Sequence, residues 1–401
     1  MFNSGTLTFL LGSLMIGAGI GVKATEYPLS EKYSGTSFFD GWKFPVETYD
    51  NTTNGDVFWA TAQNTSLLYV NDAGRVVLKV DNTTSVPYNE KRYAPKLLSK
   101  ETYGPGTVFV MDATHVPYGC SVWGAFWTQG AYWPAGGEID IFEGINQRTT
   151  NMMALHTSGG SCTIDNSTTM TGRIDSADCD QSANSGSGCT VYDQSDNSYG
   201  EAFSQAGGGV FVTEWTNESI KIWFISRANV PSSLSSTAES LDTSTLGTPT
   251  AEYSSSTCDI EHLFEPLDIT LCGDFAGLPA LLQQTCPALQ GDKTCYTTYV
   301  IDDGSTTYAN AYFELNYINI YASSSNSSGS GSATSPSGIG KATTTITAGV
   351  GSQTSTKISS TNGTTSNSAS GPTIGLKSVR LSWIMGMVGS VGIWMGVGFF
   401  W

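Results

Sequence analysis

The alternation of apolar and polar residues along the middle of the chain predicts β-strands. Side chains of a strand point in turn to the two faces of its sheet, so a half-buried strand is apolar at every second position. No long segment repeats its apolar residues with the period of a helix. Alternating segments occupy residues 76–81, 106–112, 210–215, 220–225 and 312–321, and the third and fourth predict a hairpin with a four-residue loop.

These strands predict an all-β fold over residues 25–322. Many strands with Gly-rich connections favour a β-jelly roll, a sandwich of two antiparallel sheets. Roughly 300 residues are long for such a sandwich, so we expect long decorating loops. The segment 157–209 is predicted to form a wall of a cleft, because binding sites concentrate on loops carried by a rigid scaffold.

Both ends of the chain have the composition of targeting segments. Residues 7–22 are apolar and precede Ala24, which predicts a signal peptide over residues 1–24. Residues 323–370 are rich in Ser, Thr and Gly and predict an extended stalk. Residues 371–401 end in an apolar, uncharged tail and predict a glycolipid (GPI) anchor signal that is removed. A plain transmembrane helix is the alternative.

The expected location is therefore outside the cell, on the outer face of the plasma membrane or in the cell wall. Seven N-glycosylation sequons agree with passage through a secretory compartment. Eight cysteines without a C-x-x-C pair predict disulfides rather than a zinc site. Seven of the eight lie within 162–189 and 258–295, so we expect local disulfides in those two regions, with the connectivity left open.

The charge of the chain restricts its partners. Charged residues make up only 13% of the chain, and the formal net charge is −17. This argues against nucleic acid and anionic lipid surfaces, which require basic patches, and is compatible with a neutral polymer. No P-loop, G-x-S-x-G or H-E-x-x-H motif is present, so nucleotide, serine-hydrolase and zinc-protease chemistry are unsupported. We expect no cofactor.

Three acidic residues within six positions are the candidate catalytic groups. Glu138 and Asp140 flank Ile139, so their side chains share one face of a strand. Glu143 has the opposite phase and joins them only if the strand contains one extra residue, a β-bulge. Bulges recur beside active sites because they re-aim a side chain. The alternative is an exposed acidic strand face with no catalytic role.

The expected spacing of the two glutamates favours one glycosidase mechanism. With the bulge, their backbones are about four strand steps apart, roughly 13 Å at about 3.3 Å per residue. Each side chain reaches roughly 4 Å along its bonds, so the carboxyls can approach to about 5 Å. That is the separation in retaining enzymes. There, one carboxylate attacks the anomeric carbon while the other protonates the leaving oxygen and then activates water.

Aromatic residues precede the acids along the chain. Trp123, Trp127 and Trp133 lie within the preceding 15 residues, and aromatic faces stack on the C–H faces of sugar rings. Most tryptophans of a sandwich are core residues, so each one also has that reading. His156 ends the next predicted strand, 151–156, where it either faces the acids or has a structural role.

The segment 133–146 closely resembles the active-site strand of glycoside hydrolase family 16, whose laminarinase-type branch has the pattern E-x-D-x-x-E. The segments 223–227, 256–260, 268–274 and 312–317 also resemble the fungal endo-1,3(4)-β-glucanases of that family. The resemblance extends over roughly residues 30–322 and rests on specific motifs at several separated places.

The resemblance implies a β-jelly roll with the catalytic strand on its concave sheet. It implies Glu138 as nucleophile, Glu143 as acid/base and Asp140 as the residue that tunes Glu138. The predicted substrate-binding residues are Trp127, Trp133, His156, Asn146 and Phe275. Many relatives have Trp where this chain has Phe275, and the smaller ring is expected to weaken one subsite or shift the linkage preference.

The resulting hypothesis is a monomeric endo-acting retaining hydrolase of β-1,3 and mixed β-1,3/1,4 glucan. A cell-wall transglycosylase of the same family is the first alternative, although related glucan–chitin transferases usually have the shorter E-x-D-x-E spacing. A non-catalytic glucan-binding surface protein is the second, and the intact pair of glutamates argues against it. The family can carry a structural calcium ion, but the sequence has no ligand motif for one.

Overall fold

The computed structural model describes residues 26–50, 55–275 and 279–323. All of them belong to one of the two compact units of the chain, and the other unit, residues 329–384, lies outside the described residues. The predicted signal peptide (1–24), the anchor signal (371–401) and the stalk beyond Ser323 lie outside them too. Within the described ranges, no helix is both long and apolar enough to cross a membrane.

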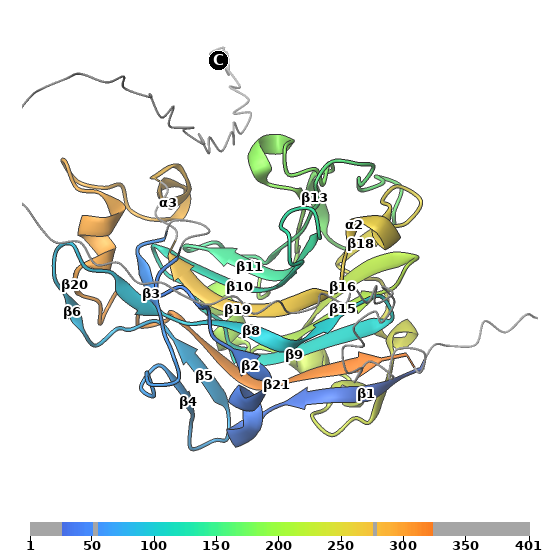
Figure 1. Cartoon of the computed structure of the whole chain (residues 1–401), viewed down its shortest axis with the longest axis horizontal. Coiled ribbons are helices and arrows are strands. Elements are labelled where there is room, and N and C mark those ends of the chain that lie inside the picture. Colours follow the sequence, from blue (N-terminus) through green and yellow to red (C-terminus); the bar gives the residue numbers. More distant parts are fainter. Residues whose placement is uncertain (1–25, 51–54, 276–278, 324–401) are drawn as a thin grey trace, which may run out of the picture. The chain divides into compact units, whose positions relative to one another are not determined.

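Two large antiparallel sheets stack face to face, which confirms the predicted all-β jelly-roll sandwich (Figure 1). The nine-stranded sheet contains, in spatial order, β17 (Ser240–Asp242), β1 (Glu26–Tyr33), β21 (Tyr312–Ala322), β9 (Thr107–His115), β15 (Gly209–Trp215), β16 (Ser219–Ser226) and β18 (Ala251–Ser254), with β5 (Val76–Lys79) and β4 (Leu68–Val70) joined to β21. The eight-stranded sheet contains β13 (Arg173–Ser176), β14 (Cys189–Tyr192), β12 (Met152–His156), β11 (Glu138–Ile145), β10 (Val122–Gln129), β19 (Leu267–Phe275), β8 (Lys96–Tyr103) and β2 (Trp42–Lys43).

Short elements complete the described fold. Two further strand pairs join β20 (Asp302–Asp303) to β6 (Ser85–Val86) and β3 (Val57–Trp59) to β7 (Arg92–Ala94). The helices are α1 (Gly200–Gln205), α2 (Ile260–Leu263), α3 (Pro279–Thr285), a π-helical turn η6 (Tyr296–Val300) and the 3-10 turns η1 (Gly35–Gly41), η2 (Asn184–Gly186), η3 (Arg227–Asn229), η4 (Ser232–Leu234) and η5 (Thr243–Leu246). The predicted hairpin is β15–β16, but its loop has three residues, because Ser219 already pairs in β16.

The core lies between the facing sides of the two sheets. Phe142 of β11 packs with its ring centroid 5.3 Å from that of Phe211 in β15 and 5.8 Å from that of Phe313 in β21. The nine-stranded sheet is also covered on its other face, where Val110 and Val212 pack with Trp223. Its central strands are therefore buried on both faces, and the eight-stranded sheet keeps its outer face for the polar residues discussed below.

The disulfides correct the expectation of local bonds. Among the three disulfides within residues 26–323 that the structure describes, only Cys179–Cys189 is local, with 10 residues of separation. Cys162–Cys258 and Cys120–Cys286 join partners 96 and 166 residues apart. The two cysteine-rich regions are separate in sequence but adjacent in the fold, where Cys162 and Cys258 form an isolated antiparallel bridge. Sequence clustering therefore did not indicate spatial pairing.

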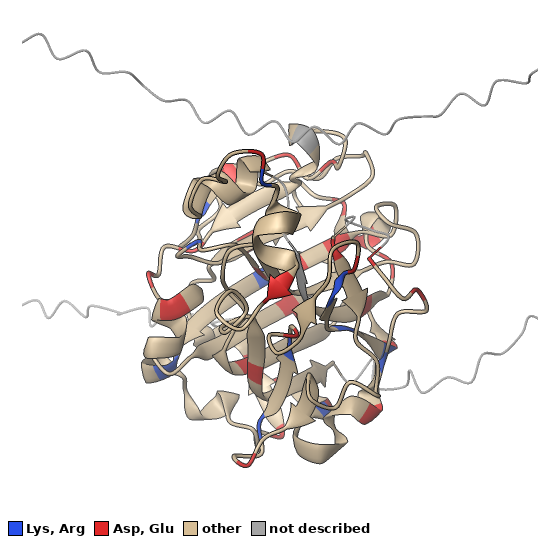
Figure 2. Ribbon diagram, turned by 90° about the vertical axis from the view of Figure 1, so that its left-hand side faces the viewer, with Lys and Arg blue, Asp and Glu red and all other residues tan. Residues whose placement is uncertain are grey.

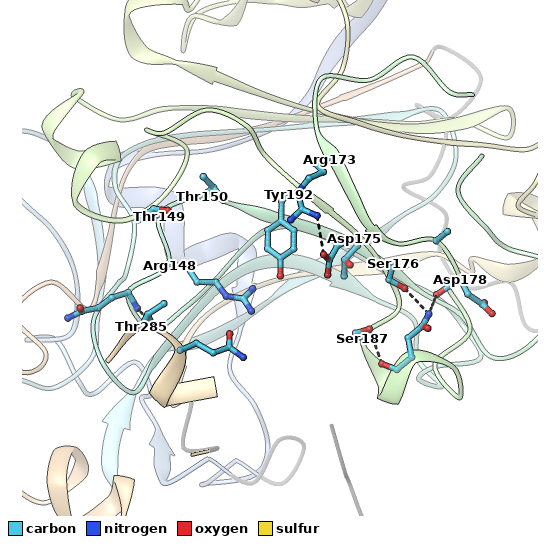
Figure 3. A pocket seen from close by; sticks show the side chains of 15 residues that line it. Arg148, Thr149, Thr150, Arg173, Asp175, Ser176, Asp178, Ser187, Tyr192 and Thr285 are labelled. Atoms are coloured by element: carbon cyan, nitrogen blue, oxygen red, sulfur yellow. Dashed lines mark hydrogen bonds and ion pairs between the residues drawn. The ribbon is translucent and has the colours of Figure 1, made fainter. Parts of the chain in front are cut away.

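A pocket of about 980 Å³ opens beside the eight-stranded sheet (Figure 3). Its walls are residues 147–150, the segment from β13 to β14, and the end of α3. In Figure 1, α3 and β13 stand on opposite sides of β10 and β11. Of the segment 157–209, which was predicted to form a wall of a cleft, residues between 173 and 192 line this pocket, and the segment contains β13, β14, η2 and α1 in addition to loops. Acidic and basic residues are scattered over the ribbon (Figure 2).

We predict that Gly144→Ala destabilises the sandwich. Gly144 lies in β11 next to Glu143, and a Cβ atom there would overlap the buried ring of Tyr199. Overpacking of this kind costs about 1–3 kcal/mol. Gly104→Ala is the matched control, because a Cβ atom at that position meets no atom within 4 Å. Denaturant unfolding of both variants measures the difference, and equal free energies of unfolding would contradict the packing argument.

Candidate active site

A β-bulge in β11 places the three acids on one face, as predicted from the alternation of apolar and acidic residues along this segment. Glu138 pairs with His156 and Asp140 with Ala154, but Glu143 pairs with Met152. Three residue steps along β11 therefore match two along β12, so β11 contains one extra residue. The register against β10 shifts at the same place. Ile139, Ile141 and Phe142 are all fully buried in the core on the opposite side.

The side chain of Asn151 holds the bulge. Its Oδ1 accepts a hydrogen bond from the backbone N–H of Glu143 at 2.9 Å, and its Nδ2 donates to the carbonyl of Ile141 at 3.0 Å. An extra residue disrupts the ladder between strands, so these two backbone groups need another partner. One fully buried amide supplies both a donor and an acceptor. Asn151 thereby fixes the direction in which the Glu143 side chain points.

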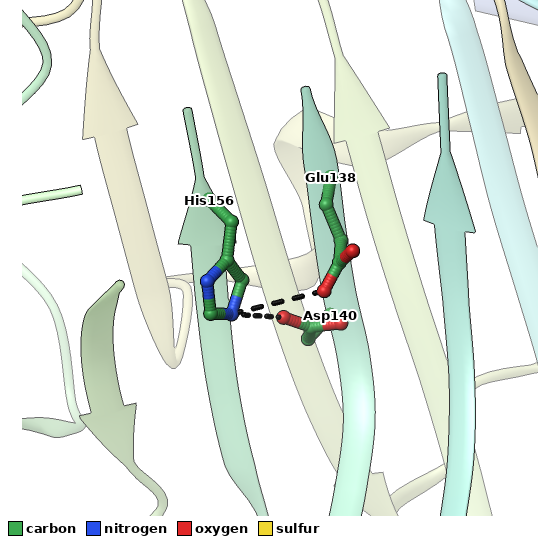
Figure 4. Close-up of side chains that lie close together, drawn as sticks. All are labelled: Glu138, Asp140 and His156. Carbon is green, nitrogen blue, oxygen red and sulfur yellow. Dashed lines mark ion pairs between the residues drawn. The ribbon is translucent and has the colours of Figure 1, made fainter. Parts of the chain in front are cut away.

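His156 approaches two of the acids from the neighbouring strand β12 (Figure 4). Its Nε2 lies 3.2 Å from Oδ2 of Asp140 and 3.7 Å from Oε1 of Glu138. Its Nδ1 lies 2.5 Å from Oε1 of Gln181. An amide oxygen only accepts, so Nδ1 carries a proton and Nε2 faces the carboxylates. A second proton on Nε2 makes the ring a cation that hydrogen-bonds on both sides.

Burial and mutual charge set the proton affinities of this cluster. Burial and the charge of Asp140 raise the pKa of Glu138 to about 8, and burial raises that of Asp140 to about 6. Burial also raises the pKa of Glu143. For His156, burial lowers the pKa, but the carboxylates of Glu138 and Asp140 outweigh it and raise the pKa to about 10. Near neutral pH the cluster thus contains a cationic imidazole and keeps a proton on a carboxyl group.

Glu143 has a separate set of partners. The indole Nε1–H of Trp123 donates to its Oε1 at 2.7 Å, which lowers the pKa of the carboxyl against the effect of burial. Trp123 lies on β10, the strand that pairs with β11 on the side opposite to β12. The two glutamates therefore have different surroundings, with a histidine beside Glu138 and a tryptophan donor on Glu143.

Two of the predicted substrate-binding tryptophans lie near the acids. Trp127 is half-buried on β10 and pairs with Asp140, and its ring lies 5.6 Å from the Lys96 ammonium group. Trp133 lies in the connection from β10 to β11, is 41% exposed, and lowers the pKa of Glu138 through its indole N–H. An exposed ring beside a buried carboxyl is suited to stacking on a sugar.

The structure does not bring Asn146 to this face. Asn146 follows the end of β11 with a φ of 59°, is fully buried, and accepts a hydrogen bond from the backbone N–H of Ser121 at 2.7 Å. It holds the turn that precedes β10. Phe275 is the last residue of β19 and pairs with Val122, but its side chain lies outside the described ones, so its predicted role stays a prediction.

The spacing argument missed Asn151 and Gln181. Neither lies in a recognisable motif, and both act across strands or from a loop. In the sequence each is only an amide residue in a connection, Asn151 after β11 and Gln181 after β12. Such residues are too common in connections to be singled out. Glu138, Asp140 and His156 also form a group of oxygen and nitrogen atoms within 4.8 Å of one another. The ionised imidazole accounts for this closeness, because it pairs with both carboxylates.

A known family matches most of the described chain. Its family model, "XgeA-like, catalytic GH16 domain", matches residues 42–321. The chain belongs to glycoside hydrolase family 16. The match confirms the predicted resemblance to this family.

Relatives in family 16 include several fungal proteins. The chain is 34% identical to a probable glycosidase of Schizosaccharomyces pombe, over 75% of this chain and 70% of that protein. It is 35% identical to the endo-1,3(4)-beta-glucanase xgeA of Emericella nidulans, over 78% of this chain and 50% of that protein. A probable endo-1,3(4)-beta-glucanase of Aspergillus fumigatus is 36% identical, over 79% of this chain and 49% of that protein. The chain thus spans only about half the length of these two glucanases.

Solved structures of family 16 show the same fold. Laminarinase 16A from Phanerochaete chrysosporium, with β-glucans bound in its donor and acceptor sites, superposes with a TM-score of 0.68 at 32% identity, over 74% of this chain and 99% of that one. An elongating β-1,3-glucosyltransferase of family 16 superposes with a TM-score of 0.67 at 34% identity, over 74% of this chain and all of that one. Hydrolases and a transferase therefore share this architecture.

We predict that Asn151→Ala loosens the bulge. The change leaves the N–H of Glu143 and the carbonyl of Ile141 without their partner, at about 1–3 kcal/mol for each buried group left unpaired. Denaturant unfolding measures the loss. Asn229→Ala is the control, because Asn229 donates only to an exposed serine hydroxyl. If Asn151→Ala is no less stable than the control, then Asn151 does not support the bulge.

We predict that His156→Gln raises the pKa of Glu138, Asp140 and Glu143. The imidazolium charge lowers all three, so its removal makes each carboxylate harder to form. Carbon-detected NMR titration of the side-chain carboxyls measures the shift. His262→Gln is the control, because His262 is exposed and pairs only with Asp259. Unchanged titration of all three acids would show that His156 carries no charge in the folded protein.

Proposed function

We propose that this chain is an endo-acting retaining glycoside hydrolase that cleaves β-1,3 and mixed β-1,3/1,4 glucan. The observation that carries the proposal is the bulge of β11, which gives Glu143 the same face as Glu138 and Asp140 in a member of family 16. A buried amide that fixes the direction of one glutamate is not expected in an acidic strand that has no catalytic role. The fungal relatives named above are described as endo-1,3(4)-beta-glucanases, which supports the substrate class.

The proposed first step uses both glutamates. The Glu138 carboxylate attacks the anomeric carbon while Glu143 gives its proton to the glycosidic oxygen, so the carbon–oxygen bond breaks and the shortened chain leaves. The nucleophile must be ionised for this step, so the proton that a pKa of about 8 keeps on Glu138 near neutral pH has to be on Glu143 instead when the substrate reacts. The cationic His156 reduces the cost of ionising Glu138, because it lies against Glu138 and Asp140.

The second step reverses these roles. The Glu143 carboxylate takes a proton from water, the water oxygen attacks the anomeric carbon, and Glu138 is released with its charge restored. Asp140 contacts His156, and its charge raises the pKa of Glu138, so it is placed to tune the proton affinity of the Glu138 carboxylate before the first step and after the second. Trp127 and Trp133 are the proposed stacking surfaces for the sugars next to the cut, with His156 lining the same subsites.

We further propose that the enzyme works outside the cell, attached through a GPI anchor to the plasma membrane or cell wall. The sequence features at both ends and the seven sequons support this location. Asn166 and Asn217, two sequon residues within the described chain, are exposed and accessible to glycosylation. A glucan of the cell surface would then be the substrate most available to the enzyme.

A transglycosylase of the same site is the second candidate. The elongating β-1,3-glucosyltransferase has a similar TM-score and a slightly higher identity than the laminarinase, which favours keeping it. The two reactions share the first step. They differ only in whether water or a sugar hydroxyl attacks the glycosyl-enzyme in the second step.

We predict that the purified protein converts laminarin and mixed-linkage glucan into short oligomers of retained anomeric configuration. Glu138→Gln is expected to lower kcat by about 1,000-fold or more, because glutamine cannot act as the nucleophile. Glu261→Gln, on the exposed surface of α2, is the matched control.

Mass spectrometry of products formed with labelled chitin oligomers present separates the two candidates. Short glucans without labelled adducts support the hydrolase, whereas labelled hybrids establish the transglycosylase. Inverted products, or a Glu138→Gln variant as active as the control, would contradict the proposed mechanism. A protein that binds glucan but forms no product in either assay would be a binding protein.

A further inference from the structure

The pocket of about 980 Å³ described above has no part in the proposed chemistry (Figure 3). Ligand pockets of proteins typically have volumes of about 300–1,000 Å³, so this one has room for more than a single sugar. Nearly all of its lining residues carry a polar group: amides, hydroxyls, two arginines and two aspartates surround one tyrosine. The hydrogen bond from the N–H of Gln147 to Thr285 joins the loop after β11 to α3 on one side of it.

Tyr192 organises the two cations of the pocket. The guanidinium carbons of Arg148 and Arg173 lie 5.5 and 5.2 Å from the centroid of its ring, and Figure 3 shows the ring between the two side chains. Cation–π attraction of this kind fixes the direction of a guanidinium group. Their N–H groups are thereby presented to the same space.

The two arginines differ in their other partners. Arg173 forms an ion pair with Asp175 at 3.2 Å. Arg148 is half-buried and contacts the sulfur of Met152 at 3.4 Å, and no carboxylate of the described residues forms an ion pair with it. The charge of Arg148 lowers the pKa of Glu143, and Arg148 also lowers the pKa of Tyr192. An arginine carries five N–H donors, so Arg148 retains donors for a ligand beside these groups.

Strand register locates the pocket relative to the acids. Glu143 pairs with Met152, and Met152 pairs with Tyr192, so Tyr192 is two strands from Glu143 at the same level of the sheet. Two strand spacings amount to about 10 Å. A chain that crosses the strands over the acids therefore continues directly into the pocket.

We propose that this pocket is a further subsite for the glucan chain, remote from the bond that is cut, with Tyr192, Arg148 and Arg173 as its binding residues. The chemistry fits a neutral sugar because every sugar hydroxyl both donates and accepts. The guanidinium groups donate, whereas Asp175 and Asp178, which also line the pocket, accept. The two carboxylates make the site unfavourable for an anion. This inference rests on the proposed function for the substrate class.

The subsite has a measurable consequence, which is a preference for long chains. A glucan of two or three units can span the bond that is cut with only one unit on the side of the pocket, and it then leaves the pocket empty, whereas a polymer fills both. Removing the subsite should therefore change only the reaction of the long substrate. Uniform loss on both substrates is what a general structural defect would give.

The test compares Tyr192→Phe, which keeps the ring that holds Arg148, and Arg173→Ala with the unaltered protein on β-1,3-glucan oligomers of two or three units and on polymeric laminarin. Each variant should lower kcat/KM for laminarin about tenfold, mainly through KM, and leave that for the short oligomers within about twofold, because only binding contacts are lost. Arg75→Ala is the matched control, since Arg75 lies next to β5 in the other sheet and contacts Glu314. Arg148 is left intact because its charge acts on Glu143.

Equal losses on short and long substrates, or none on either, would overturn the proposed subsite. Calorimetry on Glu138→Gln with β-1,3-glucan of seven units keeps the question separate from catalysis. There, addition of Tyr192→Phe should weaken binding about tenfold. Unaltered protein that cuts no glucan while this binding difference persists would reject the proposed hydrolysis and support the subsite. The absence of any binding difference would reject the subsite.

Discussion

The hydrogen bonds of one buried amide determine what the acidic strand can do. Without the extra residue in β11, strict alternation would turn Phe142 to the open face and Glu143 into the core. Two backbone groups leave the ladder at this point, and Asn151 receives one and donates to the other. Phe142 packs between the sheets against Phe211 and Phe313, and this packing also favours the orientation in which Phe142 faces the core and Glu143 the open face. The direction of Glu143 thus follows from core packing and from the satisfaction of backbone hydrogen bonds together.

Charge balance in the site depends on a single histidine. Three carboxyl groups placed on one strand and largely removed from water repel one another, which raises their pKa values. His156 reduces this repulsion only as a cation, and Gln181 occupies the Nδ1 side of the ring so that Nε2 faces the acids. The site is therefore a cluster of four titratable groups, in which the state of each depends on the others.

Much of this arrangement was readable from the sequence, because its signals are local. The alternation along 138–143 predicted the bulge, and the apolar phase predicted which of its residues enter the core. Asn151 and Gln181 were not predictable, since their roles depend on which strand pairs with which and in what register. Asn146 looked like a site residue by position, but a left-handed backbone turned it toward Ser121. The prediction of local disulfides was wrong for a similar reason, because the fold brings together two regions that are distant in sequence.

The short Cys179–Cys189 loop links the acid–base chemistry of the site to the oxidation state of two cysteines. Gln181 lies inside that loop, two residues after Cys179, and the adjacent Cys162–Cys258 bond fastens the same region to the segment before α2. Reduction of these bonds would release the backbone that presents the amide oxygen to His156. Reduction would thus leave the three acids in place but remove the acceptor on Nδ1 of His156, and with it the constraint that aims Nε2 at Asp140 and Glu138.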